Sequence, residues 1–222
     1  MSGKWIILMG APGCGKGTQS EYLTSEHNFA VISAGDLLRS NKDKQIDLSG
    51  KTIGEVISSG ALLPDGVVLD LVKIELQNME DVALKNILFD GFPRTPGQAK
   101  SLNAVANSLG SKISCVLNFV VDDEVITTRI LGRYKCSKCG KIYNDYFLRP
   151  IKDGICDVCG SVEFDRRADD NEESLRTRLK EYHGKTVALI DFYSEMGVLK
   201  MINADADFET VKKSVLECLG LS

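Results

Sequence analysis

Short apolar runs alternate with longer amphipathic stretches along most of the chain. The runs have the length of buried strands, and the stretches between them repeat their apolar positions with the period of a helix. Strands that alternate with helices indicate βαβ units and a parallel sheet covered on both faces. We expect strands at residues 5–9, 30–32, 86–90, 113–120 and 198–202. We expect helices at residues 16–27, 65–78, 95–108, 123–133, 172–195 and 207–219.

Two segments break this alternation. Residues 33–67 contain short helical pieces and several glycines, and residues 134–170 combine weak periodicity with four cysteines. A loop as long as the second segment is unusual in a compact domain, so we interpret it as a small insertion clamped by a metal. The expected fold class is α/β, with a doubly wound, five-stranded parallel sheet that binds ligands at the carboxyl ends of its strands. The expected core comprises residues 1–32, 68–133 and 171–222.

A glycine-rich segment, GAPGCGKGT at residues 10–18, follows the first expected strand and opens the first expected helix. Its glycines allow a tight turn that directs backbone N–H groups at phosphate oxygens, and the helix N-terminus adds its dipole. Lys16 can reach the outer phosphates. The common motif has Ser or Thr directly after the lysine, whereas Gly17 intervenes here and the hydroxyl follows at Thr18. A glycine turn used only for packing is the alternative, but strand, spacing and lysine together favour a nucleotide phosphate.

The nucleotide-binding residues predicted in this loop are Gly13, Cys14, Gly15, Lys16, Gly17 and Thr18. Among them, Cys14 is better explained as a small structural residue than as a catalytic thiol. Asp90 closes the apolar run at 87–89, which places it at the carboxyl end of a buried strand beside the loop. A carboxylate there can hold Mg²⁺ through water, since that ion keeps much of its hydration. A turn aspartate before Gly91 is the alternative.

Four cysteines form two CxxC pairs with sixteen residues between them: Cys136, Cys139, Cys156 and Cys159. This spacing is typical of a zinc site, and four thiolates leave no open position, so the metal should be structural. Unpaired thiols or a redox pair are the alternatives. A zinc ribbon could also bind nucleic acid, but residues 134–165 carry five basic and five acidic side chains. Without a basic surface, a lid is the better interpretation.

The composition narrows the partners and the compartment. The net charge is −4, from 27 basic and 31 acidic residues, which disfavours a nucleic-acid partner. No apolar run approaches the ~20 residues of a membrane span, and the first strand lacks the flanks of a signal peptide. Seven cysteines, an odd number, favour intracellular metal binding over a secreted disulfide framework. We therefore expect a cytoplasmic protein with no membrane partner.

Three motifs occur in the order and at the strand ends of one known family. Gly-Lys-Gly-Thr at 15–18, Ser-Ala-Gly-Asp at 33–36 and Asp-Gly-Phe-Pro-Arg at 90–94 resemble the adenylate kinases, and the resemblance extends to Asp207. It implies a reversible, magnesium-dependent transfer of the terminal phosphoryl group of ATP to AMP, which gives two ADP. It also implies a monomer with an AMP-binding arm at 33–67 and a lid at 134–170.

The resemblance also implies roles for individual residues. Arg39 and Arg94 would contact the AMP phosphate, and Gln98 would read the adenine edge, since an amide offers both a donor and an acceptor. Relatives that act on UMP or CMP usually carry asparagines in that motif, so Gln98 favours AMP. The family commonly has Thr at the position of Ala34, and loss of that hydroxyl weakens strict selectivity for AMP. The other residues implied on the AMP side are Ala61, Leu62, Leu63, Gly91, Phe92, Pro93, Arg167 and Arg178. Those implied on the ATP side are Arg129, Arg133, Ile142, Tyr143 and Ala206.

Phosphoryl transfer relies on positioning and electrostatic stabilisation, and the attacking AMP phosphate is already ionised, so no general base is required. The catalytic set that the resemblance implies is accordingly cationic: Lys16, Arg94, Arg129, Arg133, Arg167 and Arg178. Arg129 and Arg133, four residues apart on one expected helix, should point the same way. Two alternatives remain open: a kinase of the same fold that uses GTP or a pyrimidine monophosphate, and a zinc-ribbon binding protein whose loop only switches with nucleotide.

Overall fold

The fold is described from a computed structural model, in which residues 4–46, 50–80 and 83–221 are described. The expected core and AMP-binding arm also include residues 1–3, 47–49, 81–82 and 222, which lie outside the described residues. Among the described residues, no helix is long and apolar enough to cross a membrane.

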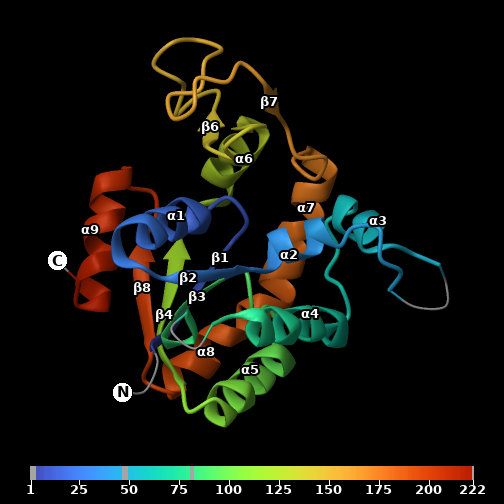
Figure 1. The fold of residues 1–222 in the computed structure, drawn as a ribbon, viewed down its shortest axis with the longest axis vertical. Coiled ribbons are helices and arrows are strands. Elements are labelled where there is room, and N and C mark those ends of the chain that lie inside the picture. Colours follow the sequence, from blue (N-terminus) through green and yellow to red (C-terminus); the bar gives the residue numbers. More distant parts are fainter. Residues whose placement is uncertain (1–3, 47–49, 81–82, 222) are drawn as a thin grey trace.

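A five-stranded parallel sheet forms the centre of the molecule (Figure 1). Its strands follow the order β2-β3-β1-β4-β8, and every neighbouring pair is parallel. Their bounds are β1 Lys4–Gly10, β2 Ala30–Ser33, β3 Asn86–Asp90, β4 Lys112–Val120 and β8 Leu199–Asn203. The predicted α/β fold class with five parallel strands is therefore confirmed, and each strand end lies within one residue of its expected position.

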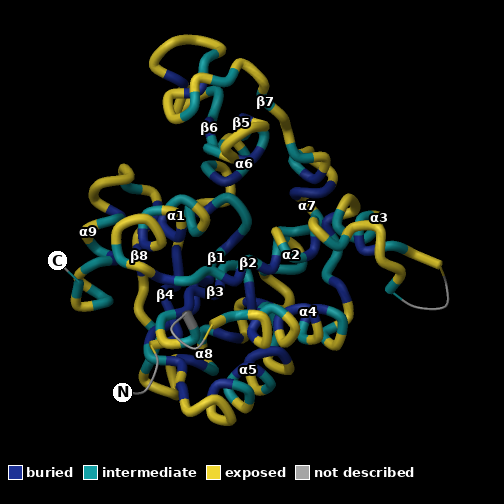
Figure 2. Tube along the Cα trace, in the orientation of Figure 1, coloured by how far each residue is buried: buried dark blue, intermediate teal, exposed yellow. Residues whose placement is uncertain are grey.

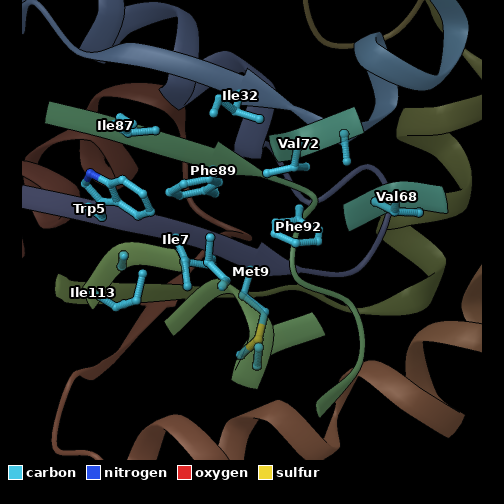
Figure 3. Close-up of a cluster of buried hydrophobic side chains, with 14 of the residues drawn as sticks. Trp5, Ile7, Met9, Ile32, Val68, Val72, Ile87, Phe89, Phe92 and Ile113 are labelled. Carbon is cyan, nitrogen blue, oxygen red and sulfur yellow. The ribbon is translucent and has the colours of Figure 1, made fainter. Parts of the chain in front are cut away.

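Helices cover both faces of the sheet because side chains alternate along each strand. Trp5, Ile7 and Met9 of β1 pack in one cluster with α4 (Asp65–Asn78), α5 (Pro96–Ser108) and α8 (Ala188–Glu195) (Figure 3). Ile6 and Leu8 pack on the opposite face with α1 (Lys16–His27) and α9 (Phe208–Leu219). The buried strands and the alternating burial of the outer helices are visible in Figure 2. A strand buried on both faces explains the continuous apolar run at 5–9.

Two expected helices end or change earlier than the sequence pattern predicts. The helix expected at 123–133 is α6, Asp123–Leu131, and Arg133 begins a strand. Gly132 ends the helix where a Cβ would come within 2.8 Å of the Tyr146 ring. The helix expected at 172–195 is divided into α7 (Glu172–Glu181), a wider π turn (Tyr182–Thr186) and α8. The prediction that Arg129 and Arg133 share one helix is therefore wrong.

Both insertions extend from the sheet as separate small units (Figure 1). The first carries α2 (Ala34–Ser40) and α3 (Ile53–Ser58), and leads into α4. The second is an antiparallel sheet in the order β6-β5-β7. Its strands are β5 Arg133–Cys136, β6 Ile142–Asn144 and β7 Phe164–Asp165. A short 3-10 turn, η1 at Ala83–Lys85, precedes β3.

Candidate functional site

Three strand ends meet at one edge of the central sheet. β1 leads into the glycine-rich loop, β2 into α2, and β3 ends at Asp90. These strands are neighbours in the order β2-β3-β1, and folds of this kind bind ligands outside the carboxyl ends of parallel strands. The loop, Asp90 and the first insertion therefore lie around one crevice.

The glycine-rich loop has the backbone geometry of an anion-binding turn. Gly13 and Gly15 have φ values of 79° and 101°, where a residue with a side chain is strained. A Cβ at Gly13 would also lie only 2.8 Å from the Ile130 side chain. None of the described side chains caps the N-terminus of α1, so its first N–H groups are open to a phosphate.

Lys16 lies against this loop. Its Nζ donates hydrogen bonds to the carbonyl oxygens of Gly10 at 2.8 Å and Ala11 at 2.9 Å, and contacts Cys14 Sγ at 3.2 Å. The Cys14 side chain is buried in the cluster formed with α1 and α9, which fits a structural role. Gly17 and Thr18 are in the first turn of α1. The positive charge is thus held where the loop amides converge.

Asp90 connects the loop with the acceptor side. A Cβ at Gly17 would lie 3.7 Å from Asp90 Oδ2, so the carboxylate borders the start of α1. Burial raises the pKa of Asp90, while the positive charges of Lys16 and Arg94 act in the opposite direction. Burial lowers the pKa of Arg94, and the Asp90 charge opposes that shift. Asp90 therefore lies within electrostatic range of both cations, and its carboxylate could hold a hard divalent ion.

A cavity opens between α2, α3, α4 and the segment after β3. Nine residues predicted from the sequence line it: Ala34, Arg39, Ala61, Leu62, Leu63, Gly91, Arg94, Gln98 and Arg178. Six further residues line it that the sequence analysis missed: Gly35, Leu38, Ile57, Gly60, Val68 and Asp169. The mixture of apolar walls and three arginines suits a flat base joined to a phosphate.

Some of the missed residues could have been identified from the local sequence pattern, and others could not. Leu38 is four residues after Ala34 on α2, so helical spacing could have identified it. Gly60 has φ 78°, and a Cβ there would lie 2.4 Å from the Ser174 carbonyl oxygen of α7. That close approach joins segments far apart in the sequence, and nothing in the local pattern indicates it.

Three residues predicted for the AMP side are not among the described residues that line the cavity. Phe92 is fully buried in the sheet core, where its ring lies 6.3 Å from that of Phe89. Pro93 follows it through a cis peptide bond. Arg167 lines a small hollow on the lid side, together with Arg133 and Ile142.

Two aspartates pair with two of the predicted arginines, Arg133 beside the lid and Arg178 at the cavity. Arg133 pairs with Asp170 through two hydrogen bonds, of 2.7 and 2.5 Å. Arg178 lies 3.2 Å from Asp169 and 3.6 Å from Asp170. Bidentate geometry of this kind also suits a phosphate, which offers the same array of acceptors. The sequence analysis did not identify either aspartate as a site residue.

Burial and mutual repulsion affect the arginines themselves. Burial lowers the pKa of Arg178 to about 10, and the charges of Arg133 and Arg94 act in the same direction. Burial likewise lowers the pKa of Arg167 to about 10, reinforced by Arg133 and Arg39. Arg133 therefore lies within electrostatic range of both Arg167 and Arg178, and Arg178 also within range of Arg94, while Asp169 and Asp170 oppose these charges. Such a cationic group favours an anion.

The four lid cysteines come together in the second insertion. Their sulfur atoms all lie within 4.8 Å of one another, and all four are free thiols. Tetrahedral zinc with ~2.3 Å bonds to sulfur requires sulfurs roughly 3.8 Å apart, so this cluster fits a closed four-thiolate metal site. Cys136 and Cys156 are buried and Cys139 is exposed, and four thiolates would leave a metal there no open position for substrate.

The remaining ATP-side predictions have different surroundings. The Tyr143 side chain is 1% exposed and lies in the lid interior, where its hydroxyl accepts from Asp157 N at 2.8 Å. Ala206 lies between β8 and α9, at the carboxyl edge of the sheet. Arg129 is in α6, and its carbonyl accepts from Asn144 Nδ2 of the lid. Ile142, Arg129 and Ala206 are half-buried, whereas the Tyr143 ring is enclosed.

Comparison with known proteins agrees with this geometry. A family model described as Adenylate kinase matches residues 8–198. The adenylate kinase of Caldicellulosiruptor saccharolyticus is 43% identical over 216 residues, which cover 97% of this chain and 99% of the relative. That of Zymomonas mobilis is 40% identical over 96% of this chain and 95% of its own, and that of Paracoccus denitrificans is 41% identical over 96% of both chains. The chain belongs to the adenylate kinase family.

Proposed function

We propose that the protein reversibly transfers the terminal phosphoryl group of ATP to AMP, with the formation of two ADP. The observation that carries this proposal is that Asp90 lies within electrostatic range of cations from two separate regions. One is the glycine-rich loop with Lys16, and the other is the apolar cavity with Arg39, Arg94 and Arg178. An enzyme that joins two nucleotides through their phosphates needs such a pair of sites.

In the proposed complex, the loop amides and Lys16 hold the outer phosphates of ATP, while Arg39 and Arg94 hold the phosphate of AMP. Arg133 and Arg178 are paired with aspartates in this structure, and phosphate oxygens would compete for the same N–H donors. The guanidinium groups then offset charge that spreads over the transferred group. No general base is needed, because the attacking phosphate oxygen is ionised.

Two metals belong to this proposal. Asp90 would hold Mg²⁺ through water, and the ion would neutralise phosphate charge when bound. Zinc is the proposed ion of the four-cysteine cluster, since a set of four thiolates favours it. It would hold the lid in shape without contact to substrate.

The same proposal includes a division of the chain into domains, a cellular compartment and an oligomeric state. Residues 33–67 would form the AMP-binding arm, residues 134–170 the lid over ATP, and the remaining residues the core. A lid excludes water that would otherwise accept the phosphoryl group. Seven free thiols are expected in a reducing compartment, in support of a cytoplasmic enzyme. Similarity to the family supports a monomer.

The decisive assay supplies ADP alone, with and without Mg²⁺, and measures ATP and AMP by ³¹P NMR or chromatography. Equal amounts of ATP and AMP should form only when Mg²⁺ is present. Acceptors are then compared at equal concentration with ATP as donor. No disproportionation of ADP would contradict the proposal, and faster turnover of CMP or UMP than of AMP would redirect it to another monophosphate.

A further inference from the structure

The amide of Gln98 is held by the protein at both ends. Its Nε2 donates to Asp65 Oδ1 at 2.9 Å, and its Oε1 accepts from the backbone N–H of Arg94 at 2.7 Å. Gln98 is 2% exposed and lines the cavity. Asp65 is not among the described residues that line that cavity, so it acts on the cavity through Gln98.

Asp65 is itself fixed in place. It is the first residue of α4, where a carboxylate is favoured by the helix dipole. Its second oxygen, Oδ2, accepts from Thr95 Oγ1 at 2.7 Å, and the same threonine oxygen caps α5 by accepting from Gln98 N at 3.1 Å. A Cβ at Gly97 would lie 2.9 Å from Asp65 Oδ2, so the helix backbone closes around the carboxylate.

These partners allow only one orientation of the Gln98 amide. The two ends of a side-chain amide are alike in size, and a half-turn exchanges its donor and its acceptor. After such a turn, Oε1 would face the Asp65 carboxylate and Nε2 would face the N–H of Arg94. Acceptor would then oppose acceptor, and donor would oppose donor. A carboxylate can only accept hydrogen bonds, so Asp65 requires the nitrogen at its end of the amide, and the Arg94 N–H requires the oxygen at the other.

The fixed amide retains one N–H on Nε2 and one lone pair on Oε1 for a ligand. A 6-aminopurine offers an acceptor at N1 and a donor at its amino group, which match this pair. A 6-oxopurine offers a donor at N1 and an acceptor at O6, which would require the turned amide. Gln98 is also the one uncharged polar side chain among the described residues that line the cavity, because Ala34 has no hydroxyl.

We propose that Asp65 is a specificity-determining positioning residue: it locks the Gln98 amide in the orientation that accepts a 6-aminopurine monophosphate and rejects a 6-oxopurine monophosphate. The proposal rests on the proposed function, in which the cavity holds the acceptor nucleotide and Gln98 contacts its base. It assigns to a residue outside the cavity the choice between two bases of nearly equal shape.

The test compares kcat/KM for AMP and for inosine monophosphate, with ATP as donor, in the wild type and in Asp65→Asn. Asparagine keeps the shape but can turn its own amide, so residue 65 no longer excludes the turned Gln98 and only the Arg94 N–H still disfavours it. We expect the wild type to prefer AMP by at least ~100-fold, as sites built around a polar contact do. The ratio should fall roughly ten- to a hundredfold in the variant. The change should appear in KM for the monophosphate, while KM for ATP stays constant.

Matched variants separate positioning from damage to the fold. Asp70→Asn makes the same charge change on an exposed position of α4 and should leave the ratio unchanged. Asp65→Ala should lower the ratio as Asp65→Asn does. In Gln98→Leu, where no amide remains, a second change at Asp65 should have no further effect on the ratio. A general loss of folded protein would lower kcat/KM for AMP and for inosine monophosphate in proportion, and would not change their ratio.

The outcomes distinguish the two proposals. If the wild type does not use AMP, the proposed function fails. If it uses AMP but neither Asp65 variant changes the ratio from its wild-type value, the positioning role of Asp65 is wrong. Calorimetry on the wild type gives a test that needs no variant, because it compares the Kd values of the two monophosphates. Inosine monophosphate that binds as tightly as AMP would contradict a fixed orientation of the Gln98 amide.

Discussion

Lys16 is the one charged residue of the glycine-rich loop, residues 10–18, and its amine is held by two loop carbonyls. Replacement by methionine keeps most of the volume and removes the charge. We expect Lys16→Met to lower kcat by at least 10²–10³-fold, comparable with the loss of one preorganised electrostatic contact in other enzymes. The melting temperature should fall by only a few degrees. ADP disproportionation and thermal unfolding measure the two effects.

Lys100→Met is the matched control, because Lys100 is exposed on α5 and outside the site. It should retain the wild-type rate. A Lys16→Met rate within tenfold of the wild type would show that the loop amides alone hold the phosphates, and would remove Lys16 from the catalytic set.

At this scale, the sequence predicts which residue types form the site better than it predicts their partners. The loop, Asp90 and Arg94 each follow a strand end, so short-range pattern is sufficient to place them. Asp169 and Asp170 contact arginines of β5 and α7. Those contacts depend on how the chain returns from the lid, which no local pattern encodes. The Asp65–Gln98 contact joins residues 33 positions apart and is hidden for the same reason.

Helix α9 shows how a single side chain defines an element. Asp207 accepts from Thr210 N at 3.1 Å and from Thr210 Oγ1 at 2.7 Å, which caps the helix. These hydrogen bonds from Thr210 lower the pKa of Asp207. A carboxyl group whose pKa is lower in the folded state stabilises the fold above its unfolded pKa, and this contribution disappears as the pH falls through the folded value.

We therefore expect Asp207→Ala to lower the melting temperature by about 2–4 °C at pH 7. The difference from the wild type should shrink only below the ordinary aspartate pKa of 3.8, once the wild-type carboxyl is protonated. Urea unfolding at a series of pH values measures it. Asp207→Asn keeps a capping oxygen and should lose less stability than Asp207→Ala. Equal losses for both variants would contradict a capping role.

A comparison of the expected and observed ends of the helices shows what apolar periodicity can predict. The start and end of α1 and α4 agree with apolar periodicity, whereas the helix expected at 172–195 does not reveal its π turn. In that turn, the Thr186 hydroxyl donates to the Arg94 carbonyl oxygen at 3.1 Å. A contact with a distant segment thus accompanies the local change of pitch. Periodicity reports which face of a helix is buried, and not where tertiary contacts widen a turn.

The whole molecule has apolar clusters of very different size. The sheet core contains two large clusters on opposite faces, while the lid contains three buried residues with a few partly buried neighbours. Tyr134, Tyr143 and Phe164 bring their rings within 5.5–5.8 Å of one another. So small a cluster buries too little apolar surface to hold a separate unit, and such units usually need a metal or disulfide. The lid should therefore depend on its metal, and the sheet should not.

Removal of the metal should then unfold the lid and leave the core intact, and the two parts can be observed separately. Trp5, the one tryptophan, is fully buried in the sheet core, where its indole N–H donates to the Leu84 carbonyl oxygen at 2.8 Å.

After chelation, or in Cys136→Ser, proteases should cut within residues 134–165, while Trp5 emission keeps its wild-type wavelength until a higher temperature. Cys218→Ser, outside the cluster, should match the wild type in both measurements. The lid cluster contains no residue of the sheet clusters, and polar contacts such as Asn144 with the Arg129 carbonyl and Lys141 with Glu21 join lid and core, so loss of the lid cluster removes little apolar contact from the sheet. A shift of Trp5 emission in step with lid cleavage would mean that the metal stabilises the entire fold.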